Sequence, residues 1–218
     1  MDGRQARRAA ELLERAYGNA SYYLKFGTPL ELMVAAILSA QTRDEVVNAI
    51  TPELFRRYRT ARDYAGAGPE GLMKYIGRVS FAGAKAKNII GACRILVEKY
   101  DGAVPRRMEE LLELPGIGRK TANTILINAY GIVEGIPVDT WVIKLSGRIG
   151  FSRGGKPDEI ERDLMRIVDR EHWRNFGYVL KSHGKSVCQS QVPLCSRCLI
   201  GPGSDAPICP RNGVTKSG

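Results

Sequence analysis

The chain has 218 residues, which is more than one small hydrophobic core needs and enough for one large domain or two modest ones. Hydrophobic residues make up 44% of the sequence and charged residues 26%, so the composition excludes a disordered or collagen-like chain. The net charge of +10 favours a polyanionic partner, nucleic acid first, over a basic charge that only aids solubility.

Nothing in the sequence indicates a membrane protein. The longest uninterrupted apolar stretch, residues 32–38, is far too short to cross a bilayer. The first 18 residues carry charge throughout and lack the apolar core of a signal peptide. We therefore expect a cytoplasmic protein without a signal peptide or a membrane partner.

Helical patterns follow one another along the chain, and no segment alternates convincingly between apolar and polar residues. Thr28, Pro29 and Glu31 form an expected N-cap, first-turn proline and capping-box acid, and the helix that they open is apolar on nearly all sides. Cys93 lies on an apolar helical stripe and is expected in the core. The sequence predicts an all-α fold with helices over residues 4–17, 30–40, 46–58, 89–100, 108–112, 119–130, 140–148, 158–169 and 172–183.

A glycine-rich string, LPGIGRKTA at residues 114–122, joins two of these helical segments. Gly116 and Gly118 permit a tight reversal, and their amides can approach a phosphate closely because no side chain intervenes. The next helix begins here, so its free N–H groups and its dipole face the same anion, and Arg119 adds positive charge. A plain helix–helix turn is the alternative. The whole string in a basic chain indicates a grip on DNA phosphates that senses the backbone rather than the sequence.

Lys120 and Asp139 are the candidates for chemistry. An amine can attack the sugar C1′ and expel a base, leaving a Schiff base, and a helix N-terminus beside Arg119 favours the neutral amine. A carboxylate can accept the amine proton or stabilise the positive sugar that develops. The two residues lie on successive helical segments, so we expect a cleft between them. The alternatives are a phosphate contact for Lys120 and an N-cap for Asp139.

Four cysteines occupy the turn-rich segment after residue 187 in the pattern C-x6-C-x2-C-x10-C. Four thiolates close in sequence suit either zinc or a [4Fe–4S] cluster, and the spacing alone does not decide between these metals. Secreted disulfides are not expected in a chain without a signal peptide. The candidate ligands are Cys188, Cys195, Cys198 and Cys209.

The string at residues 114–122, followed by VDT at residues 138–140, resembles the helix-hairpin-helix DNA glycosylases, most closely the endonuclease III family. The similarity begins upstream at LSAQTRD, residues 38–44, and reaches the cysteine segment, so it covers nearly the whole chain. It implies an all-α fold of two helical lobes with a DNA-binding cleft between them. One lobe would be a six-helix domain with the helix-hairpin-helix, residues 22–134, and the other an iron–sulfur cluster domain, residues 1–21 plus 135–218.

The resemblance implies a bifunctional enzyme, both a DNA glycosylase and an apurinic/apyrimidinic (AP) lyase, for oxidised or ring-saturated pyrimidines. Lys120 would attack C1′, Asp139 would assist, and β-elimination would nick the strand. The expected partner is double-stranded DNA with damaged bases or abasic sites, bound by a nucleoid-associated monomer. The alternatives are a mismatch or uracil glycosylase of the same fold, whose purely monofunctional form Lys120 argues against, and a non-catalytic iron–sulfur protein that clamps DNA.

The resemblance also implies a [4Fe–4S] cluster, held in this family by the pattern C-x6-C-x2-C-x5-C. The first three cysteines match this pattern, but ten residues rather than five precede Cys209. The inserted residues 201–205 look like a loop, which leaves Cys209 able to fold back. The cluster would be structural.

Two further residues match family positions that open the duplex. Gln41 corresponds to the residue that fills the gap left by a flipped base, and Phe81 to an apolar wedge. The alternatives are a helix-end amide for Gln41 and a core-anchored loop residue for Phe81. The usual VDTH of the family is VDTW here, with Trp141, and this departure puts the contacts around the site and the substrate preference in doubt, but not the amine chemistry.

Overall fold

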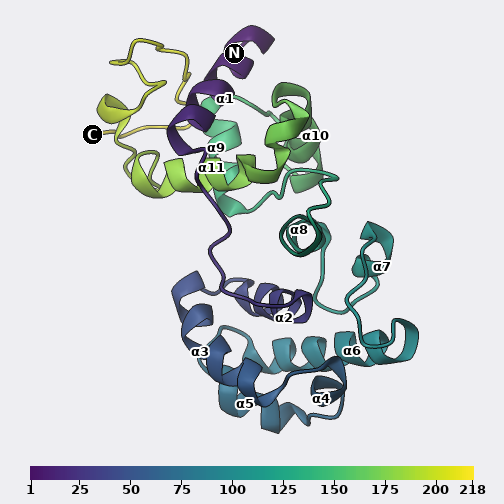
Figure 1. Cartoon of the computed structure of the whole chain (residues 1–218). Coiled ribbons are helices and arrows are strands. Elements are labelled where there is room, and N and C mark those ends of the chain that lie inside the picture. The colour runs from purple at the N-terminus through teal and green to yellow at the C-terminus, as the bar shows by residue number, and fades with distance from the viewer. The chain divides into compact units, whose positions relative to one another are not determined.

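The computed structural model describes all 218 residues, and every regular element in it is helical, so the all-α prediction is confirmed (Figure 1). No helix is long and apolar enough to span a membrane. In chain order the elements are α1 (Gly3–Tyr17), α2 (Pro29–Ser39), α3 (Asp44–Arg57), α4 (Ala61–Ala65), α5 (Pro69–Ile76), α6 (Ala82–Lys99), α7 (Met108–Leu112), α8 (Arg119–Ile125), the π-helix η1 (Leu126–Tyr130), α9 (Thr140–Ile149), α10 (Pro157–Ile167), the 3₁₀ turn η2 (Arg170–His172), α11 (Trp173–Ser186) and the 3₁₀ turn η3 (Cys195–Arg197).

Each expected helical segment forms a helix, with ends that differ by a few residues. Three features were not expected from the sequence. The short helices α4 and α5 lie between α3 and α6, α6 begins at Ala82 rather than near Ile89, and the segment at 119–130 changes from α-helix to π-helix at Leu126. These differences leave the helical class unchanged.

The chain divides into two compact units, one made of residues 1–22 with 135–218 and the other of residues 23–134. These bounds lie one residue from the division expected from the sequence. That the discontinuous unit is an iron–sulfur domain stays a prediction. The two units are described separately below.

The unit of residues 23–134 is built around α2. Thr28 caps this helix by accepting a hydrogen bond from the Glu31 amide at 3.2 Å, and Pro29 occupies the first turn as expected. The Glu31 carboxylate accepts from the amide of Gly27 at 2.6 Å, rather than from the amide of Thr28 that a capping box would use. Residues 32–38 are all buried, because α3, α6 and α8 pack around the helix. Cys93 on α6 is also fully buried.

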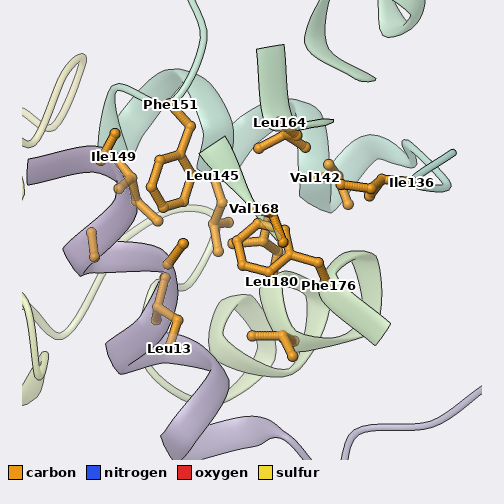
Figure 2. Close-up of a cluster of buried hydrophobic side chains, with 14 of the residues drawn as sticks. Leu13, Ile136, Val142, Leu145, Ile149, Phe151, Leu164, Val168, Phe176 and Leu180 are labelled. Atoms are coloured by element: carbon orange, nitrogen blue, oxygen red, sulfur yellow. The ribbon is translucent and has the colours of Figure 1, made fainter. Parts of the chain in front are cut away.

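In the discontinuous unit, the N-terminal helix α1 packs against α10 and α11 (Figure 1). Leu13 of α1 lies among buried side chains of the C-terminal half, including Leu145, Phe176 and Leu180 (Figure 2). Chain ends more than 100 residues apart therefore share one hydrophobic core, and this core stabilises α1, a helix whose length would be marginal in isolation.

Leu13→Ala should lower the free energy of unfolding by about 2–5 kcal/mol, because it removes a side chain with no exposed surface from this core. Arg4→Ala, on the exposed face of the same helix, should change it by no more than about 0.5 kcal/mol. Urea unfolding followed by circular dichroism measures both. Equal stability of the two variants would show that α1 is not part of the core.

Candidate active site and DNA interface

The glycine string forms a tight hairpin between α7 and α8. Gly116 has a φ of +83°, and a Cβ there would lie 3.0 Å from the side chain of Asn88, so any other residue would be strained at this position. Gly118 has an extended backbone with a φ of −100°, and a Cβ there would meet nothing within 4 Å. The expectation that glycine is needed for the reversal thus applies to Gly116, whereas Gly118 leaves open space in front of the helix N-terminus.

The apolar side chains of the hairpin are buried and anchor it, whereas its glycines and Arg119 are exposed to solvent. Leu114 and Ile117 are buried, while Gly116, Gly118 and Arg119 are exposed. The N-terminus of α8 is therefore presented at the surface, next to a turn whose apolar residues are buried. This is the arrangement that binds an anion such as a phosphate.

Lys120 is the second residue of α8 and is half-buried. Its carbonyl accepts a hydrogen bond from the hydroxyl of Thr124 at 2.9 Å, one turn later. The backbone of Lys120 is therefore fixed within the helix. Its side chain starts from the same helix terminus that the hairpin presents.

Asp139 is the N-cap of α9. Its Oδ1 accepts hydrogen bonds from the amides of Trp141 and Val142, both at 2.9 Å. Asp139 is thus an N-cap, which was the alternative role that the sequence indicated. The cap uses only one of the two carboxylate oxygens. Oδ2 has no hydrogen bond in the structure and the residue is half-buried, so the carboxylate is oriented by the helix and still has an oxygen for another partner.

Gln41 and Phe81 share an unusual backbone conformation. Both are non-glycine residues with positive φ, 53° for Gln41 and 57° for Phe81. Both are exposed, and Phe81 is 68% exposed, so it is not anchored in the core. A hydrogen bond of 3.2 Å from the amide of Ser80 to the hydroxyl of Thr42 joins the two loops. Strained residues of this kind are concentrated at functional sites.

The four tail cysteines line one pocket in the discontinuous unit. Burial, together with the neighbouring thiols of the other three, raises the pKa of Cys198 to about 11. No group of three or more His, Cys, Asp or Glu side chains is arranged to hold a metal ion. The structure does, however, place all four cysteines in the lining of a single pocket.

The long interval before Cys209 is accommodated by a loop. A Cβ at Gly201 would lie 2.5 Å from the carbonyl oxygen of Cys195, so the chain can turn sharply only with glycine at this position. The amide of Cys209 then donates to the carbonyl of Ile200 at 2.9 Å. The chain leaves after Ile200 and returns beside it, so the extra residues do not carry Cys209 away from the other three.

Sequence reasoning missed two residues that hold the cysteine segment. The guanidinium of Arg148, on α9, donates to the carbonyls of Cys188 at 3.2 Å, Gln189 at 2.8 Å and Ser190 at 3.1 Å. The Nε2 of His183 lies 3.6 Å from the Sγ of Cys198. The sequence offered only a weak signal for His183, namely that histidine is rare in this chain, which has two.

Trp141, the departure from the family pattern, has a structural counterpart in Gly184. A Cβ at Gly184 would lie 2.4 Å from the indole Cε3, so the ring covers a glycine backbone on α11. The ammonium of Lys144 lies 5.8 Å from the centroid of the Trp141 ring. The indole of Trp141, on α9, thus packs against α11, while its backbone amide bonds to the carboxylate of Asp139.

Residues 34–170, more than half of the chain, match the family model of the HhH-GPD superfamily base excision DNA repair proteins. This chain belongs to the HhH-GPD superfamily. The endonuclease III of Synechocystis sp. is 46% identical to this chain over 199 residues, covering 91% of this chain and 89% of that protein. The endonuclease III of Bacillus subtilis is 39% identical over 185 residues, covering 84% of each chain.

Solved structures agree with the sequence relatives. A trapped endonuclease III–DNA covalent intermediate, an estranged-adenine complex, matches with a TM-score of 0.87 and 37% identity over 91% of this chain and 93% of that one. A thermostable thymine-DNA glycosylase matches with a TM-score of 0.76 at 20% identity, which indicates a shared fold alone. Within the HhH-GPD superfamily this chain is endonuclease III-like and is a base excision repair glycosylase.

The two hairpin glycines should respond differently to alanine. Gly116→Ala should lower the free energy of unfolding by about 1–3 kcal/mol, because it places a side chain in a strained conformation against Asn88. Gly118→Ala should cost less than about 1 kcal/mol in stability but weaken duplex DNA binding about tenfold, because its methyl group stands where a phosphate would approach an amide. Thermal unfolding and fluorescence anisotropy measure the two effects. Unchanged DNA affinity of Gly118→Ala would remove the hairpin from the interface.

Proposed function

We propose that this chain is a bifunctional DNA glycosylase and AP lyase that removes oxidised or ring-saturated pyrimidines from duplex DNA and nicks the strand. The observation that carries the proposal is Lys120 at the start of the helix opened by the Gly116–Gly118 hairpin, which combines an amine with a phosphate-binding terminus. The similarity to a trapped endonuclease III–DNA covalent intermediate supports it.

In the proposed reaction the lone pair of the Lys120 Nζ forms a bond to C1′ while the glycosidic bond breaks, and the base leaves with the bonding electrons and takes up a proton. The sugar ring opens to give an imine between Nζ and C1′. Loss of a proton from C2′ then breaks the C3′–O bond by β-elimination, which nicks the strand on the 3′ side of the lesion. Hydrolysis of the imine releases the lysine.

Asp139 supports this chemistry through the carboxylate oxygen that the helix cap leaves over. We propose that Oδ2 accepts the amine proton or stabilises the positive charge that develops on the sugar. Because Oδ1 is held by two amides of α9, the carboxylate is oriented before the substrate arrives. Little reorganisation is then needed during the reaction.

DNA is bound through its phosphates and opened at the lesion. The amides of Gly116 and Gly118, with Arg119, would hold the backbone, and affinity should fall steeply with salt concentration because counterions are released. Gln41 and Phe81 would fill the space left by the flipped base. The proposal includes the DNA-binding cleft between two lobes and the monomeric state that the family resemblance implies.

We propose that Cys188, Cys195, Cys198 and Cys209 would hold a [4Fe–4S] cluster. All four line one pocket of the discontinuous unit, and cysteine thiolates are the usual ligands of such clusters. Bound there, the cluster would cross-link the chain after α11, which Arg148 already holds by its backbone carbonyls. Its role in the proposal is structural.

Lys120→Gln should abolish covalent trapping of the protein on abasic duplex DNA by borohydride, because no amine remains to form the imine. Asp139→Asn should bind damaged DNA as the wild type does but lower the single-turnover rate at least about a hundredfold. Normal trapping of Lys120→Gln would refute the lysine assignment, and unchanged kinetics of Asp139→Asn would remove the carboxylate from the mechanism.

The substrate class is tested on the same wild-type protein with a panel of lesion duplexes. Base release and nicking should be fastest with oxidised and ring-saturated pyrimidines. Release of uracil or of mismatched thymine in preference to these bases would replace the proposed substrate class. Binding without any base release or nicking would leave a non-catalytic DNA clamp.

Anaerobically purified protein should be yellow-brown with broad absorption near ~400 nm and should contain iron. Cys209→Ser should lose colour and iron, because a ligand is missing. Cys93→Ser should keep both, since Cys93 is buried in the other unit. Stoichiometric zinc without iron would overturn the cluster in favour of the zinc site.

A further inference from the structure

Lys85, on α6, is a lysine in an unusual place. The residue is only 5% exposed, and its pKa is lowered because burial disfavours the ammonium. No carboxylate forms an ion pair with it in the structure. A buried lysine without a counterion is retained only if other groups stabilise the ammonium.

Three acceptors stabilise it, and all belong to the end of α2 and the residues that follow. The Nζ of Lys85 donates to the carbonyl of Leu38 at 2.7 Å, to the carbonyl of Ala40 at 2.6 Å and to the hydroxyl of Thr42 at 2.9 Å. An ammonium has three N–H groups, so each has a partner. The charge also lies at the negative end of the α2 dipole.

The acceptors surround Gln41. Ala40 and Thr42 are its two neighbours in the chain, and both bind the same ammonium. Gln41 is therefore the middle residue of a three-residue arch, Ala40 to Thr42, in which both flanking residues accept hydrogen bonds from the Nζ of Lys85. This arch holds Gln41 in its left-handed conformation, with a φ of 53°, and leaves its side chain exposed.

Lys85 is connected to Phe81 as well. Its backbone amide donates to the carbonyl of Phe81 at 3.1 Å, in the first turn of α6. The hydroxyl of Thr42, which accepts from the ammonium, also accepts from the amide of Ser80 at 3.2 Å. The backbones on both sides of the left-handed Phe81 thus connect to the group that fixes Gln41.

We infer that Lys85 is a positioning residue for duplex opening: its buried ammonium locks the Gln41 arch to the Phe81 loop, so that both side chains enter the duplex as one preorganised unit. Two non-glycine residues with positive φ persist only where the surroundings hold them there, and Lys85 bonds to the surroundings of both. This inference rests on the proposed function of Gln41 and Phe81.

The same contacts explain why the residue is a lysine. Methionine has a similar shape but would remove the ammonium donor from the carbonyls of Leu38 and Ala40 and would leave the Thr42 hydroxyl with only the amide of Ser80. Arginine presents a flat fork of donors, which does not match three acceptors grouped around one point. Only the compact ammonium has three donors on a single atom.

The test separates opening of the duplex from the amine chemistry. Abasic DNA is offered as a duplex, which must be opened, and as a single strand, which need not be. Nicking rates are measured in single turnover on both. A duplex with 2-aminopurine opposite the abasic site reports by its fluorescence whether that base is unstacked.

Lys85→Met should lower the duplex nicking rate between about tenfold and a hundredfold, because the filling residues are misplaced, while the single-strand rate stays within about twofold. The 2-aminopurine signal should fall with it. Thr42→Val keeps the ammonium but removes the hydroxyl that links the loops, and it should lower the duplex rate in the same selective way. Lys87→Met, an exposed lysine on the same helix, is the matched control and should behave as the wild type.

A triple variant gives the sharpest result. Once Gln41 and Phe81 are both alanine, adding Lys85→Met should cost nothing further in the duplex rate, because the residues that it positions are gone. A further loss would overturn the inference. So would a Lys85→Met protein that keeps the wild-type ratio of duplex to single-strand rates, or that loses both rates equally.

The outcomes also distinguish this inference from the proposed function. If the Gln41/Phe81 double alanine variant keeps the wild-type ratio, the assignment of those two residues fails, and Lys85 positions nothing. If the double variant loses nicking of the duplex but not of the single strand, and Lys85→Met does not, only the role of Lys85 fails. Should Lys85→Met not fold, Thr42→Val decides alone, and a wild-type ratio in that variant refutes the link between the loops.

Discussion

Every α-helix end leaves backbone groups without partners inside the helix, and this chain places its functional candidates at such ends. Lys120 is the second residue of α8, Asp139 caps α9, Phe81 precedes α6 and Gln41 follows α2. At an N-terminus the free N–H groups attract an anion, which here would be a DNA phosphate. At the C-terminus of α2 the free carbonyls attract a cation, and the chain supplies it internally as the ammonium of Lys85. In the proposed function, one backbone property would therefore both bind the DNA and shape the residues that open it.

Capping and catalysis are not competing explanations for Asp139, although the sequence presents them as alternatives. A carboxylate has two oxygens, and the N-cap uses only Oδ1. The cap determines where Oδ2 points, so the structural role would serve the chemical role that we propose. A neutral cap such as serine would satisfy the helix but would leave no negative charge to face a developing positive sugar.

The sequence predicted the strong helices and the family motifs, and it failed where contacts depend on distant residues. Thr28 and Pro29 located the start of α2, but α4 has only five residues, too few for apolar periodicity to show. The capping box of Thr60 and Asp63 is the one local sequence signal for this helix. Lys85 could not be found at all, because its acceptors lie more than 40 positions away and a lone lysine in a helix reads as solvated. Those contacts exist only once α2 and α6 are packed together.

The shared core of α1 with α10 and α11 has a consequence for the nascent chain. More than a hundred residues separate Leu13 from the helices that cover it, and the intervening segment is itself a complete compact unit. At ribosomal rates of roughly 5–20 residues per second, α1 emerges and then waits roughly 8–34 s until both of its partner helices have been synthesised. During that interval its apolar side chains have no core to enter, and a helix of this length is marginal alone. The first helix to be synthesised is thus among the last to become stable, and its apolar face is open to chaperones until the C-terminal half has left the ribosome.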